Sequence, residues 1–144
     1  MSVTVRALRE EDYPRWRPLW EGYTHFYDCE LEESVTAATW ERALNPSSPM
    51  FCRVAEMDGN VIGFAMWVLQ EGTWSTAPLC YLEDLFVDAA VRGAGAGQAL
   101  IDALMEEGKR EGWSKLYWVT RQNNPARKLY DRFGEADDYV RYRI

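Results

Sequence analysis

The sequence has few of the residues that build hydrolytic or metal sites. Histidine occurs once, at His25, and there is no Gly-x-Ser-x-Gly motif, so a Ser-His hydrolase has little support. The three cysteines, Cys29, Cys52 and Cys80, are odd in number, widely spaced and without a Cys-x-x-Cys pair. This pattern argues against a disulfide framework and against a metal site. We therefore expect no metal, and a reducing cytoplasmic location.

Long apolar runs and an excess of positive charge are also missing. The longest apolar stretches, near 61–69 and 77–82, are too short to span a bilayer, and the N-terminus has no apolar signal-peptide segment. The 16 basic residues are outnumbered by 23 acidic ones, which gives a net charge of −7. Phosphate backbones would repel such a surface unless a basic patch offset it, and we find none. The sequence predicts a soluble protein that binds neither membrane nor nucleic acid.

Apolar and aromatic residues, in contrast, are plentiful. They make up 47% and 14% of the 144 residues, enough to form the core of one domain. No repeat, linker or low-complexity segment divides the chain, so we expect a single domain over 1–144. Strand and helix patterns alternate most clearly in the second half. The predicted fold class is therefore α/β or α+β, built around one mixed sheet.

Periodicity and turn residues predict the order of the elements. Strands are expected at 3–8, 51–57, 61–69, 79–87, 115–120 and 139–144. Helices are expected from Asp12 to about Tyr27, at 36–44, from the Gly-rich turn to Gly112, and at 125–133. Pro18 should kink the first helix or shift its start. Asp58-Gly59-Asn60 is typical of a hairpin turn.

The Gly-rich turn Arg92–Gly97 joins the strand at 79–87 to the following helix. Free N–H groups and the helix dipole make such a junction a site for an anion, and glycine lets the backbone approach a phosphate. The turn lacks the Lys and Ser/Thr of a P-loop, and its third glycine comes one position too early for a dinucleotide fingerprint. A simple tight turn without a ligand remains the alternative.

Two motifs resemble those of the Gcn5-related N-acetyltransferase (GNAT) family. The turn Arg92-Gly-Ala-Gly-Ala-Gly97 matches its [Q/R]-x-x-G-x-[G/A] pyrophosphate loop, and a strand precedes it and a helix follows it as the family requires. Downstream, an N-x-x-A-x-x-L-Y pattern is matched by Asn123, Ala126, Leu129 and Tyr130. The resemblance covers nearly the whole chain and implies one GNAT-like domain with a mixed, mostly antiparallel sheet flanked by about four helices.

The run Tyr81–Val87 is similar to the diamine (spermidine/spermine) acetyltransferase branch of that family. One position departs from the family pattern: Gly134 is followed by Glu135, where the family often has Gly-Phe. This departure weakens the match on the substrate side and leaves the match at the cofactor site intact.

The resemblance implies acetyl transfer from acetyl-CoA to an amine by direct attack. It assigns the CoA pyrophosphate to main-chain groups of the loop and the helix start, namely Arg92, Gly93, Ala94, Gly95, Ala96, Gly97 and Gln98. It pairs the pantetheine arm with the backbone of Leu85, Phe86 and Val87. It places Asn123, Ala126 and Tyr130 beside that arm.

The same resemblance assigns the proton transfers. Glu83 occupies the position of the base that takes a proton from the amine, and Asp84 is its substitute or its orienting neighbour. Tyr130 matches the general acid that protonates the leaving thiolate. Other interpretations stay open: the two carboxylates as a solvated pair on a strand, and Tyr130 as core packing. We interpret His25 as a surface or packing residue.

The acceptor side is less clearly marked. An acidic stretch, Asp28, Glu30, Glu32 and Glu33, is either a solvated loop or a funnel for a cationic amine. Aromatic faces that could bind such a cation, or could simply pack on the sheet, are Tyr23, Phe26, Tyr27 and Trp74. The predicted substrate-binding residues are Tyr27, Glu30, Glu32, Glu33 and Glu83.

The sequence thus predicts an acetyl-CoA-dependent N-acetyltransferase that acts on a small cationic amine such as a polyamine or diamine. Acetylation of a protein lysine or N-terminus is a second possibility, since a basic peptide would suit an acidic cleft. A non-catalytic acyl-CoA sensor is a third. By analogy with the family we expect a homodimer, paired through the strand expected at 139–144.

Overall fold

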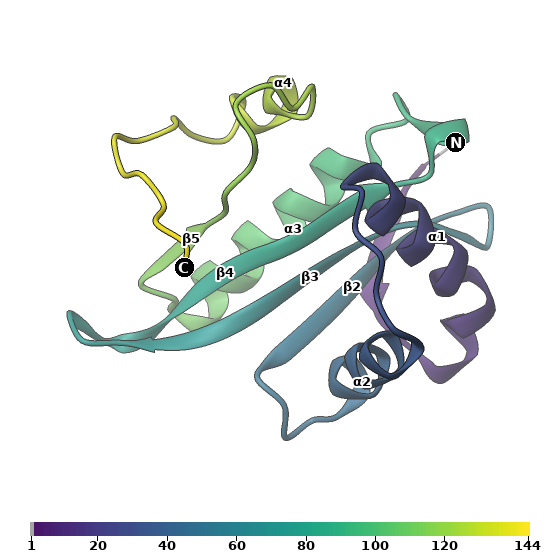
Figure 1. Ribbon diagram of the computed structural model, residues 1–144, viewed down its shortest axis with the longest axis horizontal. Coiled ribbons are helices and arrows are strands. Elements are labelled where there is room, and N and C mark those ends of the chain that lie inside the picture. The colour runs from purple at the N-terminus through teal and green to yellow at the C-terminus, as the bar shows by residue number, and fades with distance from the viewer. Residues whose placement is uncertain (1) are drawn as a thin grey trace.

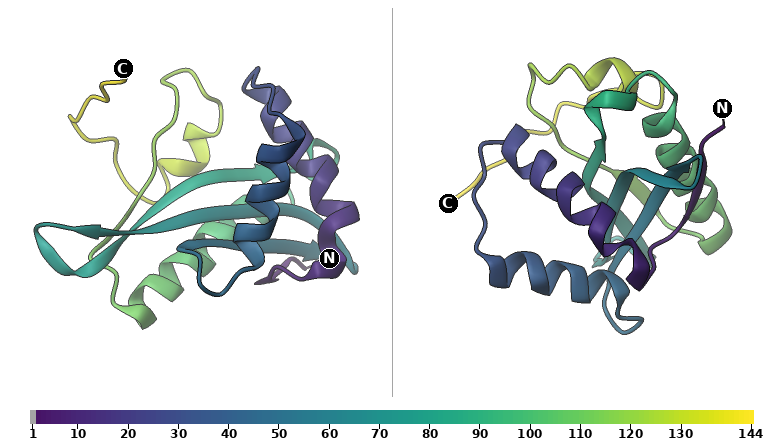
Figure 2. Two further views of the ribbon diagram at one scale, coloured as in Figure 1. Left: turned by 60° about the horizontal axis from the view of Figure 1, so that its bottom comes forward. Right: turned by 90° about the vertical axis from the view of Figure 1, so that its right-hand side faces the viewer.

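The computed structural model describes residues 2–144 as a sheet covered by helices on both faces (Figures 1 and 2). The strands are β1 (Thr4–Ala7), β2 (Met50–Met57), β3 (Asn60–Gly72), β4 (Ser75–Val87) and β5 (Lys115–Tyr117). The helices are α1 (Tyr13–Phe26), α2 (Glu33–Leu44), α3 (Ala96–Glu111) and the short α4 (Arg127–Tyr130), with 3₁₀ turns η1 (Glu10–Asp12) and η2 (Ala89–Val91). The strand order is β1-β2-β3-β4-β5, antiparallel except for β5, which runs parallel to β4. The mixed sheet is confirmed.

Each face of the sheet has its own apolar core. On one face α3 packs Leu100, Ile101 and Leu104 against the sheet. On the other face α1 packs Trp16, Leu19 and Trp20, and α2 lies beside it. The central strand β3 supplies alternate residues to the two cores and is buried without a break from Val61 to Trp67. Such continuous burial is what a strand covered on both sides requires.

Local signals place several element boundaries as expected. The helix α1 begins at Tyr13, directly after Asp12, and it continues through Pro18. The β2–β3 turn holds Asp58 and Gly59 at positive φ, as a tight hairpin requires. Gly112, at φ 75°, ends α3.

The C-terminal region differs from the prediction. The strand expected at 115–120 ends at Tyr117, and the helix expected at 125–133 is limited to Arg127–Tyr130. The closing strand expected at 139–144 is wrong, because these residues form no ladder with the sheet. They extend away from the sheet as a tail (Figure 2), and the apolar side chains of this tail are exposed. Within residues 2–144, no helix has the length and apolar character needed to cross a membrane.

Candidate active site

The Gly-rich turn forms an open cradle in front of α3. Gly93 and Gly95 adopt φ angles of 93° and 87°, and a Cβ built on either one would meet no atom within 4 Å. Gly95 is the N-cap of α3 and provides no side-chain cap. The amides of the first turn therefore have no helical partner and are available to an anion, which the positive end of the helix dipole also attracts. The geometry suits a phosphate group.

The two sequence motifs meet at Gly97. A Cβ there would lie 2.9 Å from Cδ2 of Leu129, so a larger residue would displace the Leu129 side chain where the first turn of α3 packs against α4. Arg92 closes the other side of the turn, since its Nε donates to the carbonyl of Val87 at 3.2 Å and its guanidinium lies 5.4 Å from the ring centre of Phe86. The loop is thus anchored to both α4 and the end of β4.

The end of β4 has a free edge next to this loop. The ladder between β4 and β5 covers only Leu79 to Tyr81 on β4, so β5 leaves its neighbour before residues 82–87. On the opposite side Leu85, Phe86 and Val87 pair with β3. Their outward amides and carbonyls are thus available to an extended, amide-bearing ligand, which can add to the sheet as another strand.

A β-bulge on β4 decides where the two acidic side chains point. Trp67 pairs with Leu82 and Met66 with Asp84, so Glu83 has no partner on β3. The extra residue shifts the alternation of the strand. Leu82 packs in the core under α3, whereas Asp84 lies on the α1–α2 side of the sheet. The bulge brings both carboxylates to the wall of one cavity.

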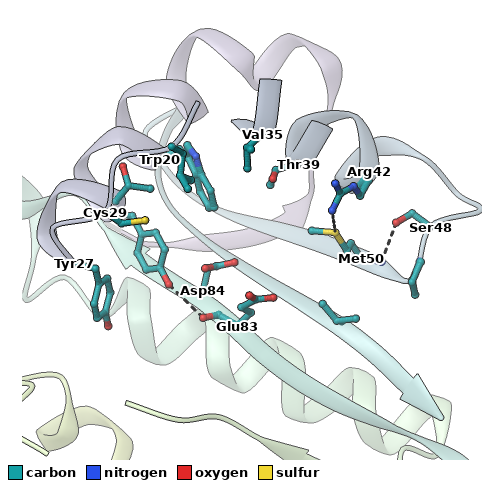
Figure 3. A pocket seen from close by; sticks show the side chains of 15 residues that line it. Trp20, Tyr27, Cys29, Val35, Thr39, Arg42, Ser48, Met50, Glu83 and Asp84 are labelled. Atoms are coloured by element: carbon teal, nitrogen blue, oxygen red, sulfur yellow. Dashed lines mark hydrogen bonds between the residues drawn. The ribbon is translucent and has the colours of Figure 1, made fainter. Parts of the chain in front are cut away.

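That cavity has a volume of about 640 Å³ and lies between α1, α2 and the ends of β2 and β4 (Figure 3). Its walls are mostly apolar and aromatic, with Trp20, Tyr23 and Tyr27 contributed by α1 and its C-cap. Glu83 and Asp84 form the acidic part of the wall. An apolar cavity with a few converging polar groups is typical of a small-molecule site.

Burial changes the acidity of Asp84. Removal of the carboxyl from water raises its pKa from 3.8 to about 7, although an interaction with the Tyr23 hydroxyl partly opposes this, and the charge of Glu83 raises it further. The Tyr23 hydroxyl also donates to the main-chain carbonyl of Glu83 at 3.3 Å. A carboxylate with a pKa near neutrality can take up a proton during a reaction at physiological pH.

A second, smaller cavity contains Tyr130. It shares Tyr23, Tyr27 and Glu83 with the large cavity, and is otherwise lined by residues of β4, α4 and the segment after β5. Burial, and secondarily Tyr27, raises the pKa of the Tyr130 hydroxyl to about 12. Tyr130 therefore stays protonated at neutral pH and can donate its proton.

Asn124, which the motif analysis missed, orders this region. Its amide donates to the hydroxyls of Tyr27 and Thr120 at 3.1 and 2.8 Å, and its side-chain oxygen accepts from the amide of Ala126 at 2.9 Å. Among residues 2–144, the exposed motif residue Asn123 has no side-chain hydrogen-bond partner. The Asn-Pro pair at 124–125 is a known turn signal and could have identified Asn124.

The acidic loop lies away from the large cavity. Glu33 is paired with Arg17 by two hydrogen bonds of 2.7 and 2.6 Å, and Glu30 and Glu32 are exposed and do not line the cavity. The residues of this loop that do reach the cavity are Cys29 and Leu31. The structure therefore does not bring the predicted acidic funnel to the site.

Of the four aromatic residues considered for the acceptor site, two line the cavities and two do not. Tyr23 and Tyr27 line both cavities. Phe26 is half exposed and lines neither of them, and Trp74, at 95% exposure, lies at the tip of the β3–β4 hairpin. Phe26 and Trp74 therefore do not line either cavity.

Comparison with known proteins gives consistent matches. The family model "Acetyltransferase (GNAT) family" matches residues 5–134. The chain is 28% identical to the D-amino-acid N-acetyltransferase HPA3 of Saccharomyces cerevisiae, over 98% of this chain and 89% of that protein. It is 29% identical to the thialysine N-epsilon-acetyltransferase of Bos taurus, over 95% of this chain and 67% of the relative.

The solved structures agree. The ribosomal-protein-alanine N-acetyltransferase of Brucella melitensis biovar Abortus 2308 superimposes with a TM-score of 0.84 at 25% identity, and the match covers 100% of this chain and 99% of that one. The family match spans the phosphate cradle, the free edge of β4 and both cavities. The chain belongs to the GNAT family of acetyl-CoA-dependent N-acetyltransferases.

Proposed function

We propose that this N-acetyltransferase transfers the acetyl group directly to the primary amine of a small molecule bound in the large cavity. The observation that carries the proposal is the position of Asp84 and Tyr130. The pKa of Asp84 is about 7 and that of Tyr130 about 12, and their two cavities share Tyr23, Tyr27 and Glu83. Asp84 and Tyr130 thus lie on either side of the residues that the two cavities share. Their different pKa values suit Asp84 to remove a proton and Tyr130 to deliver one.

Asp84 acts as the base in this scheme. An alkylammonium has a pKa near 10.4, so its deprotonation at pH 7 costs roughly 4–5 kcal/mol, and a neighbouring carboxylate lowers this barrier. The amine nitrogen then forms a bond to the thioester carbonyl carbon, and the carbon–sulfur bond breaks. One proton of the ammonium goes to Asp84 before the attack, and the departing thiolate receives the Tyr130 proton. The second proton, lost from nitrogen as the amide forms, returns to the Tyr130 phenolate. Glu83, the base expected from the resemblance, is exposed and becomes a contact for the incoming ammonium.

The loop and the free strand edge position the donor substrate. In this proposal the amides from Arg92 to Gln98 bind its pyrophosphate, and the edge at Leu85, Phe86 and Val87 pairs with its pantetheine arm. Asn123, Ala126 and Tyr130 lie beside that arm. The positive φ of Gly93 and Gly95 and the unpaired β4 edge support this assignment.

The acceptor is proposed to be a small molecule because α2 and the α1–α2 loop form one wall of the cavity opposite β4. The two carboxylates taken alone would suit a polyamine or diamine, the acceptor class expected from the sequence. The name of the yeast relative suggests a further class of acceptor, D-amino acids, which carry a carboxylate as well as an amine. Acetylation of a protein N-terminus or lysine is the second candidate, and the likeness to a ribosomal-protein-alanine acetyltransferase favours it.

A test of the scheme is the substitution Tyr130→Phe, which removes the donated proton and keeps the ring. We expect the rate of thiol release from acetyl-CoA with an accepted amine to fall about a hundredfold or more. The rise in Tm caused by acetyl-CoA should be unchanged, because the phosphate cradle is intact. Tyr139→Phe, in the exposed tail, is the matched control. A Tyr130→Phe enzyme with the wild-type rate would remove the acid assignment, and binding without turnover of any amine would favour the sensor.

We also propose a homodimer formed through the C-terminal tail. Tyr139, Val140, Tyr142 and Ile144 are among the most exposed apolar side chains, and β5 has a strand partner on one edge only. A second copy of this tail would bury those side chains and extend the sheet. Deletion of residues 139–144 should convert a dimer into a monomer in light scattering after size-exclusion chromatography. A wild-type monomer at high concentration would contradict the proposal.

The unpaired cysteines support a reducing, cytoplasmic setting.

A further inference from the structure

The large cavity has charge of both signs, on different walls. Among the residues that line it, Arg42 is the one cation, and the acids are Glu83 and Asp84. Arg42 lies on the last turn of α2, whereas both acids lie on β4. In Figure 3 the Arg42 side chain lies with Ser48 and Met50 at one end, and the acids lie toward Tyr27. Opposite charges on two walls of one cavity favour a ligand with the complementary arrangement.

The guanidinium of Arg42 is available to a ligand. Within residues 2–144 no carboxylate pairs with it, and its one protein contact is a weak one to the sulfur of Met50 at 3.9 Å. Arg17, which also faces the α1–α2 region, is instead occupied by Glu33. A guanidinium with free N–H groups is suited to bind a carboxylate through two parallel hydrogen bonds.

Ser48 adds a second donor at the same end. Its hydroxyl oxygen accepts from the amide of Met50 at 3.2 Å, which leaves its proton free to be donated. The Arg42 end of the cavity therefore offers donors, and the Asp84 end offers acceptors.

We propose that the acceptor is an amine that also carries a carboxylate, that is, an amino acid, and that Arg42 selects it by binding the carboxylate. This inference rests on the proposed function, because it assumes that the amine is directed to Asp84. A diamine would place its second ammonium toward Arg42, where the two positive charges repel each other. Arg42 is thus a specificity-determining residue that discriminates against polyamines.

Lysine and 1,5-diaminopentane provide a matched test, because they differ only in the carboxylate. The panel extends to the other standard amino acids, their D-enantiomers and the corresponding decarboxylated amines. We expect kcat/KM to be higher for the amino acid than for its decarboxylated amine. In Arg42→Gln, kcat/KM for the amino acid should fall about ten- to a hundredfold, mainly through KM, because a hydrogen-bonded charge pair is lost. The value for the amine should stay the same or rise.

Arg110→Gln is the control, since it removes the same charge from an exposed position on α3. A change of the same size in Arg42→Gln and Arg110→Gln would reflect net charge alone and would overturn the inference. A preference for decarboxylated amines across the panel, or an equal effect of Arg42→Gln on both members of each pair, would also overturn it. In either of the last two cases the proposed acetyl transfer would still stand.

A binding measurement separates this inference from the failure of catalysis. Cys29 lines the same cavity and is exposed, whereas Cys52 and Cys80 are buried, so its alkylation by iodoacetamide reports on occupancy. An amino acid should slow this alkylation in the wild-type enzyme, with acetyl-CoA omitted, and not in Arg42→Gln. Such protection without turnover would support the Arg42 site and refute the proposed base and acid. If no amino acid protects Cys29 and only the decarboxylated amines are turned over, the Arg42 site is refuted.

Discussion

The substitution Asp84→Asn should inactivate the enzyme and stabilise it at the same time. Burial raises the pKa of this carboxyl from 3.8 to about 7, so at pH 8 the folded protein holds a charge in an environment that disfavours it. A shift of about 3 units corresponds to at most about 4 kcal/mol. Partial exposure of the side chain and relaxation around it reduce this, and we expect a gain of about 1–2 kcal/mol, or roughly 3–6 °C in Tm.

The gain in stability must depend on pH in one direction. Below about pH 4 the carboxyl is protonated in both the folded and the unfolded chain, so the variant gains nothing there. Between pH 4 and 7 the unfolded chain ionises first, and the wild type loses stability relative to Asp84→Asn. Above pH 7 the difference is complete. Thermal melts of both proteins from pH 4 to 8.5 measure this directly.

Activity should follow the same ionisation. For the wild type, kcat/KM with an accepted amine should rise with pH through an apparent pKa of about 7, the value for Asp84 in the free enzyme. In Asp84→Asn this rise should disappear and the rate should fall by about 10²–10⁴-fold. Glu83→Gln separates the two carboxylates: because the Glu83 charge raises the pKa of Asp84, the rise should persist and move to lower pH.

Two results would refute this reasoning. One is an Asp84→Asn enzyme that is less stable than the wild type at every pH, which would mean that the carboxyl is a structural partner and not a strained base. The other is loss of the pH step in Glu83→Gln but not in Asp84→Asn, which would return the base to Glu83. Tyr23 and Cys52 also face Asp84, but burial raises the pKa of both well above this range, so neither can produce the step.

Two further substitutions test the phosphate cradle and the fold. Gly95→Val places a β-branched residue at φ 87°, so the apoprotein should lose about 1–2 kcal/mol in its free energy of unfolding, and acetyl-CoA should no longer raise its Tm. An unchanged rise in Tm with acetyl-CoA would exclude the cradle as the binding site. Asp12→Asn breaks the part-buried pair with Arg6 and should cost about 1–2 kcal/mol at pH 7 in a urea titration. Arg6 lowers the pKa of Asp12, so the wild-type advantage should be lost as pH falls below about 4, and a constant difference down to pH 2 would contradict it.

Short-range signals were sufficient for the loop and for most of the elements. Glycine tolerates positive φ, and the structure uses this at both Gly93 and Gly95. Gly112 ends α3 as its position in the sequence indicates. These features depend on the conformational preference of one residue and its neighbours, so they can be recognised without knowledge of the rest of the chain.

The choice between Glu83 and Asp84 could not be made from the sequence. The two residues are adjacent on one strand, and simple alternation would place them on opposite faces. The bulge at Glu83 is a property of the ladder with β3, and the high pKa of Asp84 results from α1 and the sheet closing over it. Both depend on contacts between segments far apart in the sequence.

The sequence by itself predicted most of the strands and helices, because glycine conformation, helix capping and apolar periodicity act over a few residues. Its two motifs were enough to identify the resemblance to the family and to predict the phosphate cradle. The tertiary structure decided which polar groups share a cavity. It placed Glu30, Glu32 and Glu33 outside the large cavity, brought Arg42 of α2 into the same cavity as Asp84 of β4, and left the tail at 139–144 exposed. The desolvation of Asp84 and its meeting with Arg42 in one cavity arise from the packing of distant segments, so no local pattern could have shown them.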